Sequence, residues 1–209
     1  VLIHNLTDKQ PKFYFTSPGQ AEAFLELQAA LPPPSLSVSH VHYINYTMFP
    51  AFPPHAYINL VRDPVDRLES RFYYYRRSAR TYSPGRANMS YNHCVQTRDA
   101  ECVSQRNIFS VIPFFCGQAE ICRVAGGEAL RQAMRNVEQH YLVVGHLEAF
   151  PHFLAALEKL LPQYFSGIVQ LHAETQPAEK RMTSGKPEAL TEANREYMRS
   201  LLQEEYQFY

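Results

Sequence analysis

The stretch "YINLVRDPVDRLES", residues 57–70, decides the fold that we expect for this chain. It begins inside a mostly apolar run, 55–61, which is typical of a strand covered on both faces of a parallel sheet. The run ends at Arg62-Asp63-Pro64, and proline is well suited to the first turn of a helix. We therefore expect a strand, a turn and then a long helix over about 65–80.

The rest of the chain alternates in the same way. We expect an α/β fold with a central parallel sheet flanked by helices, because strands that alternate with helices favour right-handed crossovers. With 209 residues, 1–209 should form a single domain. The further expected elements are helices over 20–30, 127–138, 148–161 and 188–209, strands over 40–46 and 140–145, a loop-rich segment over 82–123 and a polar surface loop over 172–187.

Composition is that of an ordinary globular protein, with 45% hydrophobic and 19% charged residues. The formal net charge is zero, so no global field favours nucleic acid, and an anionic partner must meet a local patch. No apolar stretch approaches the roughly 20 residues that span a bilayer. Between residues 62 and 86 there are seven arginines and only three acidic residues. These arginines are Arg62, Arg67, Arg71, Arg76, Arg77, Arg80 and Arg86.

Four cysteines and three glycosylation sequons indicate an oxidising lumen. The cysteines occupy one 29-residue window and permit three pairings, of which the local one closes two small loops. A zinc site is less favoured, because no Cys-x-x-Cys pair occurs and His93 is the only histidine nearby. The cysteines are Cys94, Cys102, Cys116 and Cys122, and the sequons begin at Asn5, Asn45 and Asn88.

The turn after the strand 55–61 is a candidate anion site. Ligands of open α/β sheets bind beyond the carboxyl ends of the strands, where Arg62 falls. The free amides and dipole of the helix that follows favour an anion, and Ser70 can add a hydroxyl. Asp63 could cap the helix or orient an arginine. The alternative is an ordinary ion pair between Arg62 and Asp63.

"YINLVRDPVDRLESRFYYYRR" followed by "IPFFCG", with "HVHYINY" upstream and the clustered cysteines, resembles the uronyl 2-O-sulfotransferases of glycosaminoglycan synthesis. The likeness runs from about Ser39 to the end and is weaker over 79–93. It implies a P-loop-like sulfotransferase fold that binds 3′-phosphoadenylyl sulfate as donor, with no metal. It also implies two local disulfides, Cys94 with Cys102 and Cys116 with Cys122.

The resemblance also assigns site residues. Arg62 and Ser70 fall on the positions that hold the 3′-phosphate of the donor, and Lys180, Arg181 and Thr183 fall in a loop that closes over it. His40 falls on the catalytic base, and a histidine that titrates near neutrality suits removal of a proton from a sugar hydroxyl.

Acceptor contacts are expected from side chains that suit a polyanionic sugar chain. In a strand over 40–46 His42 would point to the same face as His40 and could contact substrate, whereas the alternative is a hydrogen-bonded core histidine. Tyrosines 73–75 can pack against sugar rings, although at least one should be core. The acceptor-binding candidates are His42, Arg76, Arg77 and Arg80.

The expected function is sulfation of the 2-hydroxyl of hexuronic acids in dermatan or chondroitin sulfate, which His42 and Gln118 favour over heparan sulfate as acceptor. Nothing in residues 1–37 resembles a phosphate loop, so we expect this loop and the first strand upstream of Val1. Family members imply a homotrimer with a single-pass type II anchor in the Golgi, also upstream of Val1. The rival readings are a non-catalytic glycosaminoglycan-binding homologue and an unrelated P-loop kinase piece, which the cysteines and sequons disfavour.

Overall fold

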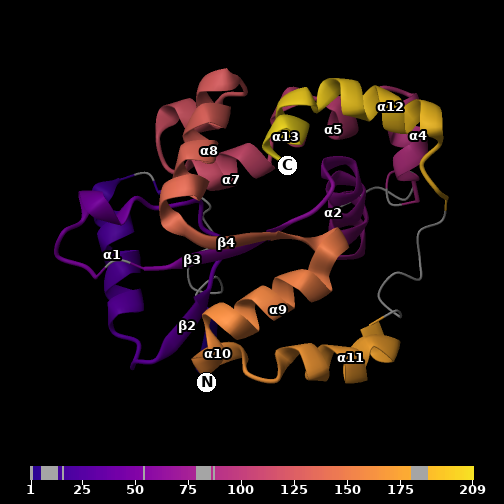
Figure 1. Ribbon diagram of the computed structural model, residues 1–209. Coiled ribbons are helices and arrows are strands. Elements are labelled where there is room, and N and C mark those ends of the chain that lie inside the picture. Colours follow the sequence, from indigo (N-terminus) through magenta and orange to yellow (C-terminus); the bar gives the residue numbers. More distant parts are fainter. Residues whose placement is uncertain are drawn as a thin grey trace. The chain divides into compact units, whose positions relative to one another are not determined.

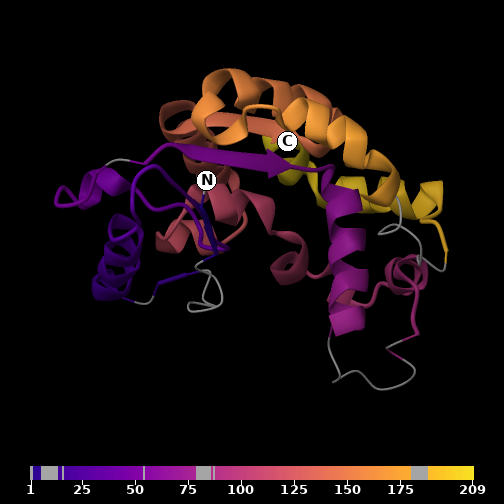
Figure 2. The ribbon, with the colours of Figure 1, turned by 90° about the horizontal axis from the view of Figure 1, so that it is seen from below.

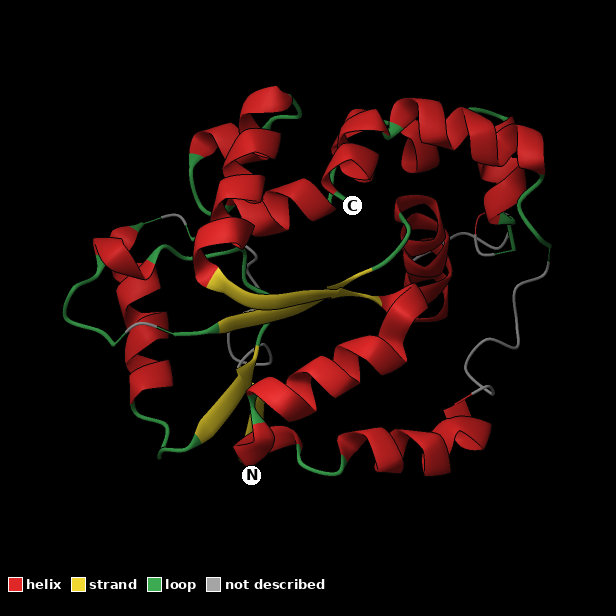
Figure 3. Cartoon of the chain, in the orientation of Figure 1, coloured by secondary structure: helices red, strands yellow, loops and turns green. Residues whose placement is uncertain are grey.

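A computed structural model of the chain describes residues 2–5, 14–15, 17–53, 55–78, 86, 88–179 and 188–209. Figures 1 and 3 show how its helices and strands follow one another. In chain order they are β1 (Leu2–Asn5), α1 (Pro18–Ala29), β2 (Ser35–Val38), the 3-10 helix η2 (Tyr46–Met48), β3 (Tyr57–Val61), α2 (Pro64–Ser78), α4 (Tyr91–Gln96), α5 (Ala100–Val103), α6 (Gln105–Ile108), α7 (Val111–Cys116), η3 (Glu120–Arg123), α8 (Gly127–His140), β4 (Tyr141–His146), η4 (Leu147–Ala149), α9 (Phe150–Leu160), α10 (Pro162–Phe165), α11 (Ile168–Glu179), α12 (Glu192–Leu201) and α13 (Gln203–Phe208).

The strands form two small sheets of two strands each within the described residues. β1 pairs with β2 in parallel, with Leu2 opposite Ser35 and Asn5 opposite Val38. β3 pairs with β4, and the two arrows run in the same direction in Figure 1. The expected parallel pairing is therefore present, although in two short sheets.

The described chain divides into two compact units. The first comprises 1–59, 112–144 and 156–166, and the second comprises 60–111, 145–155 and 167–209. The single domain over 1–209 stays a prediction.

The core of the first unit forms where α1 packs on the segment that follows β2. The helix expected over 20–30 begins two residues earlier, with Pro18 in the first turn of α1, and ends before the triple proline at 32–34. Phe24 and Leu25 of α1 are buried against Val41 and Ile44. This packing fixes the stretch that contains His40 and His42.

The core of the second unit surrounds α2, which follows directly from β3 (Figure 2). Val65, Leu68 and Phe72 repeat at helical spacing and are all buried. They pack in one cluster with Met198 and Leu202 from the C-terminal helices. The amphipathic pattern of α2 therefore orients it as expected.

Three expected elements differ from the structure. The strand predicted over 40–46 is wrong, because β2 ends at Val38 and residues 39–45 belong to no strand. The prediction of a polar loop over 172–187 is wrong for residues 172–179, because α11 extends to Glu179. The loop-rich segment 82–123 holds helices of four to six residues, too short for periodicity to reveal, and Ser90 and Asp99 cap two of them. None of the described helices is long and apolar enough to cross a membrane.

Candidate functional site

The turn between β3 and α2 is built around Asp63. Its Oδ1 accepts a hydrogen bond from the backbone N–H of Asp66 at 3.0 Å, and its carbonyl accepts from Arg67 N–H at 2.8 Å. Asp63 is therefore the N-cap of α2, one of the two roles expected for it. Arg62, immediately before it, is half-buried at the carboxyl end of β3.

Residues far along the chain hold this turn in place. The backbone N–H of Asp63 donates to Glu148 Oε1 at 3.0 Å. Tyr206 donates its hydroxyl to Asp63 Oδ2, and Tyr209 donates to Glu148 Oε2, both at 2.8 Å. Arg195 lies 2.9 Å from Asp66 Oδ1. The C-terminal helices thus fix the backbone that carries Arg62.

The first turn of α2 has fewer free amides than expected. Pro64 has no N–H, Asp66 N–H is bonded to Asp63, and Val65 N–H is bonded to the Tyr206 hydroxyl. An anion at this turn would therefore depend on side chains and on the helix dipole rather than on these amides. This result corrects the sequence-based expectation.

Glu148 is the acid that faces Arg62. Burial acts to raise the pKa of Glu148, but hydrogen bonds from Asp63 N–H and Tyr209, together with the charge of Arg62, outweigh burial and hold this pKa below its ordinary value. Arg62 thus lies close enough to Glu148 to interact with it electrostatically. Ser70 lies six residues into α2, about 9 Å along the helix axis from Pro64.

The His40 segment belongs to the first unit, and its two histidines lie in different surroundings. His40 is exposed, whereas His42 is 8% exposed. The His42 ring lies edge-on to Tyr14, with ring centroids 4.0 Å apart, and 5.6 Å from Phe114. The expectation that both rings share one face rested on a regular strand, and this segment is not one. His42 is packed as a core residue.

The loop 114–118 holds the His40 segment. Tyr43 N–H donates to the Phe114 carbonyl at 2.9 Å. Gln118 Nε2 donates to the His42 carbonyl at 2.8 Å, while Gln118 Oε1 accepts from Phe15 N–H at 2.8 Å. One side chain therefore joins the segment to a second, distant stretch of backbone.

Gly117 permits this close approach. Its φ is +110°, and a Cβ atom placed there would lie 2.8 Å from the Tyr43 carbonyl oxygen. The neighbouring disulfide joins Cys116 to Cys122, which are six residues apart. The Cys94–Cys102 disulfide lies in the second unit, so the structure contains the two local bridges that the resemblance implies.

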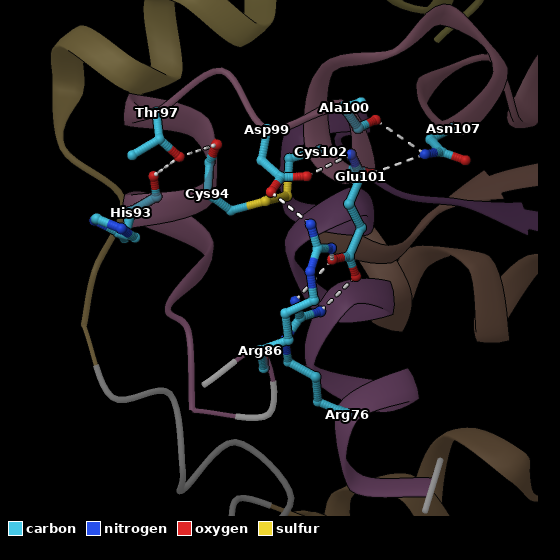
Figure 4. Close-up of polar contacts among 10 residues, drawn as sticks. All are labelled: Arg76, Arg86, His93, Cys94, Thr97, Asp99, Ala100, Glu101, Cys102 and Asn107. Atoms are coloured by element: carbon cyan, nitrogen blue, oxygen red, sulfur yellow. Dashed lines mark hydrogen bonds and ion pairs between the residues drawn. A yellow bond between two sulfur atoms is a disulfide. The ribbon is translucent and has the colours of Figure 1, made fainter. Parts of the chain in front are cut away.

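Arg76, an acceptor-binding candidate, is bound to other residues inside the fold. Its side chain is 4% exposed and forms a bidentate ion pair with Glu101, at 2.8 and 3.0 Å. Its guanidinium also lies 3.3 Å from the centre of the Phe72 ring. Figure 4 shows Arg76 and Arg86 converging on the acids beside the Cys94–Cys102 bridge. Arg76 is therefore committed to the fold rather than presented to a ligand.

The remaining predicted residues lie outside what the structure describes in full. Arg77 is in α2, but its side chain is not described. The residues outside the described ranges are Arg80, Lys180, Arg181 and Thr183. Their roles stay predictions.

Among the described residues, Cys94, Asp99 and Glu101 form a group whose potential metal-ligand atoms all lie within 4.8 Å of one another. The Cys94 sulfur is in a disulfide, and both carboxylates are paired with Arg86 at 3.0 Å. This arrangement is explained by its ion pairs.

Two of the sequon asparagines have described side chains. Asn45 is the N-cap of η2, and its Oδ1 accepts from Thr47 N–H at 3.0 Å and from the Thr47 hydroxyl at 2.8 Å. Asn88 is exposed. Asn5 lies at the end of β1.

Sequence reasoning missed Glu148, Tyr206, Tyr209 and the positioning contact of Gln118. The sequence favours Gln118 only as a marker of acceptor type. Its neighbour Gly117 was the one local signal, since a glycine after a buried cysteine suggests a tight approach. The two tyrosines had no local signal, because their partners lie 61 and 143 residues away.

Comparison with known proteins gives sequence relatives. No protein-family model matches the chain. The chain is 36% identical over 152 residues to human uronyl 2-sulfotransferase, covering 68% of this chain and 37% of that protein. It is 32% identical over 194 residues to the mouse protein of the same name, covering 84% and 46%. A Drosophila melanogaster heparin sulfate O-sulfotransferase is 34% identical over 160 residues, covering 73% and 45%. The chain thus spans less than half the length of these relatives, and the resemblance stated from its motifs is confirmed.

Proposed function

We propose that this chain, a relative of the uronyl and heparan sulfate 2-O-sulfotransferases, is part of an enzyme that sulfates the 2-hydroxyl of hexuronic acid residues in a glycosaminoglycan. The observation that carries the proposal is the turn between β3 and α2, which carries Arg62 and is held in place by contacts to Asp63. A half-buried arginine lies at the carboxyl end of a strand and before a capped helix, where anionic ligands of α/β sheets bind.

The donor in this proposal is 3′-phosphoadenylyl sulfate. Arg62 holds its 3′-phosphate through the planar guanidinium, and Ser70 adds a hydroxyl donor. Glu148 balances the charge of Arg62 before the phosphate arrives and fixes the turn through Asp63. Lys180, Arg181 and Thr183 complete the donor contacts.

His40 acts as the general base. Its imidazole takes the proton of the 2-hydroxyl while that oxygen forms a bond to sulfur. The bond between sulfur and the phosphate oxygen breaks, and 3′-phosphoadenosine 5′-phosphate leaves with the electron pair. The exposure of His40 supports this role, since a base must reach a polymer from solution. His42, which is buried, positions the segment through its backbone.

The acceptor that we favour is dermatan or chondroitin sulfate. Gln118 and His42 are the two residues that favour this acceptor, and the Gln118 side chain donates a hydrogen bond to the His42 carbonyl. Heparan sulfate is the second candidate, because the human heparan sulfate 2-O-sulfotransferase 1 is 31% identical over 160 residues. The two disulfides and the exposed Asn88 support a Golgi lumenal location. A homotrimer and a type II membrane anchor complete the proposal.

The test compares His40→Ala with His152→Ala in the intact protein, since His152 is also exposed but lies on α9. Radiolabelled donor is incubated with dermatan, chondroitin and heparan acceptors in separate reactions. His40→Ala should abolish transfer and leave the affinity for 3′-phosphoadenosine 5′-phosphate unchanged, while His152→Ala should behave as the wild type. Equal turnover of the two variants would remove His40 from the mechanism. Transfer only to heparan would reassign the acceptor.

A further inference from the structure

A cavity of about 270 Å³, partly open to solvent, lies along one side of α2 in the second unit. We name it the α2 cavity and define it by the five lining residues that carry the argument. They are Arg71, Phe72 and Tyr75 from α2, Tyr91 from α4 and Arg106 from α6. Its volume is near the lower end of the range for small-molecule sites, about 300–1,000 Å³, which suits a single sugar ring with a charged substituent.

Two arginines of α2, Arg67 and Arg71, carry positive charge at or near this cavity. Arg71 donates to the Asn107 carbonyl, and Arg67 donates to the Ser110 hydroxyl at 2.5 Å. Burial lowers the pKa of both arginines, since water that would stabilise their charge is excluded. Glu205 is a buried acid near them, and its oxygens accept from the backbone N–H groups of Ser110 and Val111. Both half-buried arginines therefore interact with the Glu205 carboxylate.

The acid at the cavity is already neutralised. Glu101 lines the cavity, but both of its oxygens are bonded to Arg76, and one of them also lies 3.0 Å from Arg86. Arg106, by contrast, is exposed, and its side chain has no hydrogen-bond or ion-pair partner among the residues that the structure describes. An exposed cation that lacks a partner among the described residues thus lies in the lining of a cavity whose lining acid is paired.

Aromatic rings form much of the remaining lining. Tyr75 is 47% exposed, so one part of its ring is available to a ligand. Phe72 and Tyr91 are buried, and the Tyr91 hydroxyl has no hydrogen-bond partner within the described chain. Aromatic surface beside convergent cations suits an anionic saccharide better than a simple inorganic anion, which would leave the rings unused.

We propose that the α2 cavity is a second binding site for the sulfated glycosaminoglycan, in which Arg71 and Arg106 hold a sulfate or carboxylate group and Tyr75 packs against the sugar ring. The identity of this ligand rests on the proposed function. Ser70 and Arg71 are adjacent in α2 and so project about 100° apart around the helix axis. The same helix therefore presents Ser70 in one direction and the cavity in another. The glycosaminoglycan would be bound in the cavity through a sugar other than the one that reacts.

The test measures binding of a dermatan sulfate hexasaccharide to the 209-residue chain by isothermal titration, without donor. Arg106→Ala should weaken binding roughly tenfold, the value of one charge-assisted contact. Arg131→Ala is the control, because Arg131 is an exposed arginine of α8 in the other unit. A second pair separates stacking from charge: Tyr75→Ala should weaken binding several-fold, whereas the adjacent Tyr74, 62% exposed and not part of the cavity lining, should tolerate alanine.

Equal losses for the Arg106 and Arg131 variants would overturn the proposal, because a diffuse attraction would then explain binding. Failure of the wild-type chain to bind would also overturn it, as would complete displacement of the hexasaccharide by 3′-phosphoadenosine 5′-phosphate. The two proposals fail separately. Arg106-dependent binding without any sulfate transfer by the intact protein would reject the proposed enzyme and keep the cavity, whereas transfer with no difference between the arginine variants would reject the cavity alone.

Discussion

Replacement of Gly117 by alanine tests whether the loop 114–118 holds the His40 segment. The new Cβ atom would lie 2.8 Å from the Tyr43 carbonyl oxygen, which is backbone and cannot rotate away. The φ of +110° adds conformational strain for any residue with a side chain. Strain of this kind and overpacking each cost roughly 1–3 kcal/mol, so the variant should lose about 4 kcal/mol of unfolding free energy.

The assay is urea unfolding followed by circular dichroism, with Gly19→Ala as the control. Gly19 is exposed in the first turn of α1 and has nothing within 4 Å of the position of a Cβ atom, so alanine there should be neutral or stabilising. In the intact protein, Gly117→Ala should also lower the turnover number for sulfate transfer more than it changes donor affinity. If the two alanine variants unfold at the same urea concentration, the argument for a tight approach at Gly117 is wrong.

Three further predictions concern the second unit. The pKa of Glu148 is lowered in the folded state from 4.5, so its contribution to stability is present above pH 4.5 and is lost as pH falls through the lower folded value. Urea midpoints measured from pH 3 to 7 should therefore fall less steeply at the acid end for Glu148→Gln than for the wild type. Arg76→Gln should destabilise the chain by roughly 3 kcal/mol, because it leaves the partly buried Glu101 without its bidentate partner, and thermal unfolding would check this. Replacing Cys94 and Cys102 together by serine should lower the unfolding free energy by about 2 kcal/mol, as a short closed loop predicts, and equal stability of oxidised wild type and variant in urea would contradict it.

Local signals predicted the part of the fold that carries Arg62. The apolar run, Pro64 and the spacing of Val65, Leu68 and Phe72 each act over a few residues, so β3, the turn and α2 occur where they were expected. The elements that sequence reasoning missed depend on distant partners. Residues 40–46 have the composition of a strand, but the backbone groups of His42 and Tyr43 bond to Gln118 and Phe114 instead.

The candidate site shows the same division. The positions of Arg62 and Ser70 followed from the motif, but the amides of the first turn of α2 were expected to be free. One of them is bonded to Tyr206, a residue whose position on this turn depends on tertiary packing alone. Arg76 belongs to an arginine-rich stretch, and composition cannot separate an arginine that faces solvent from one that Glu101 binds inside the fold.

The carboxamide of Gln118 has a consequence for the ageing of the protein. A carboxamide carries a donor and an acceptor at opposite ends, and both ends are engaged here, with His42 and Phe15. Deamidation would replace the donating nitrogen by an oxygen. The new carboxylate oxygen and the His42 carbonyl oxygen would then both be acceptors, and their hydrogen bond would be lost. A chain altered at this one atom would keep its covalent backbone and both disulfides, and yet hold His40 less firmly. Loss of activity on storage should therefore precede loss of folded structure.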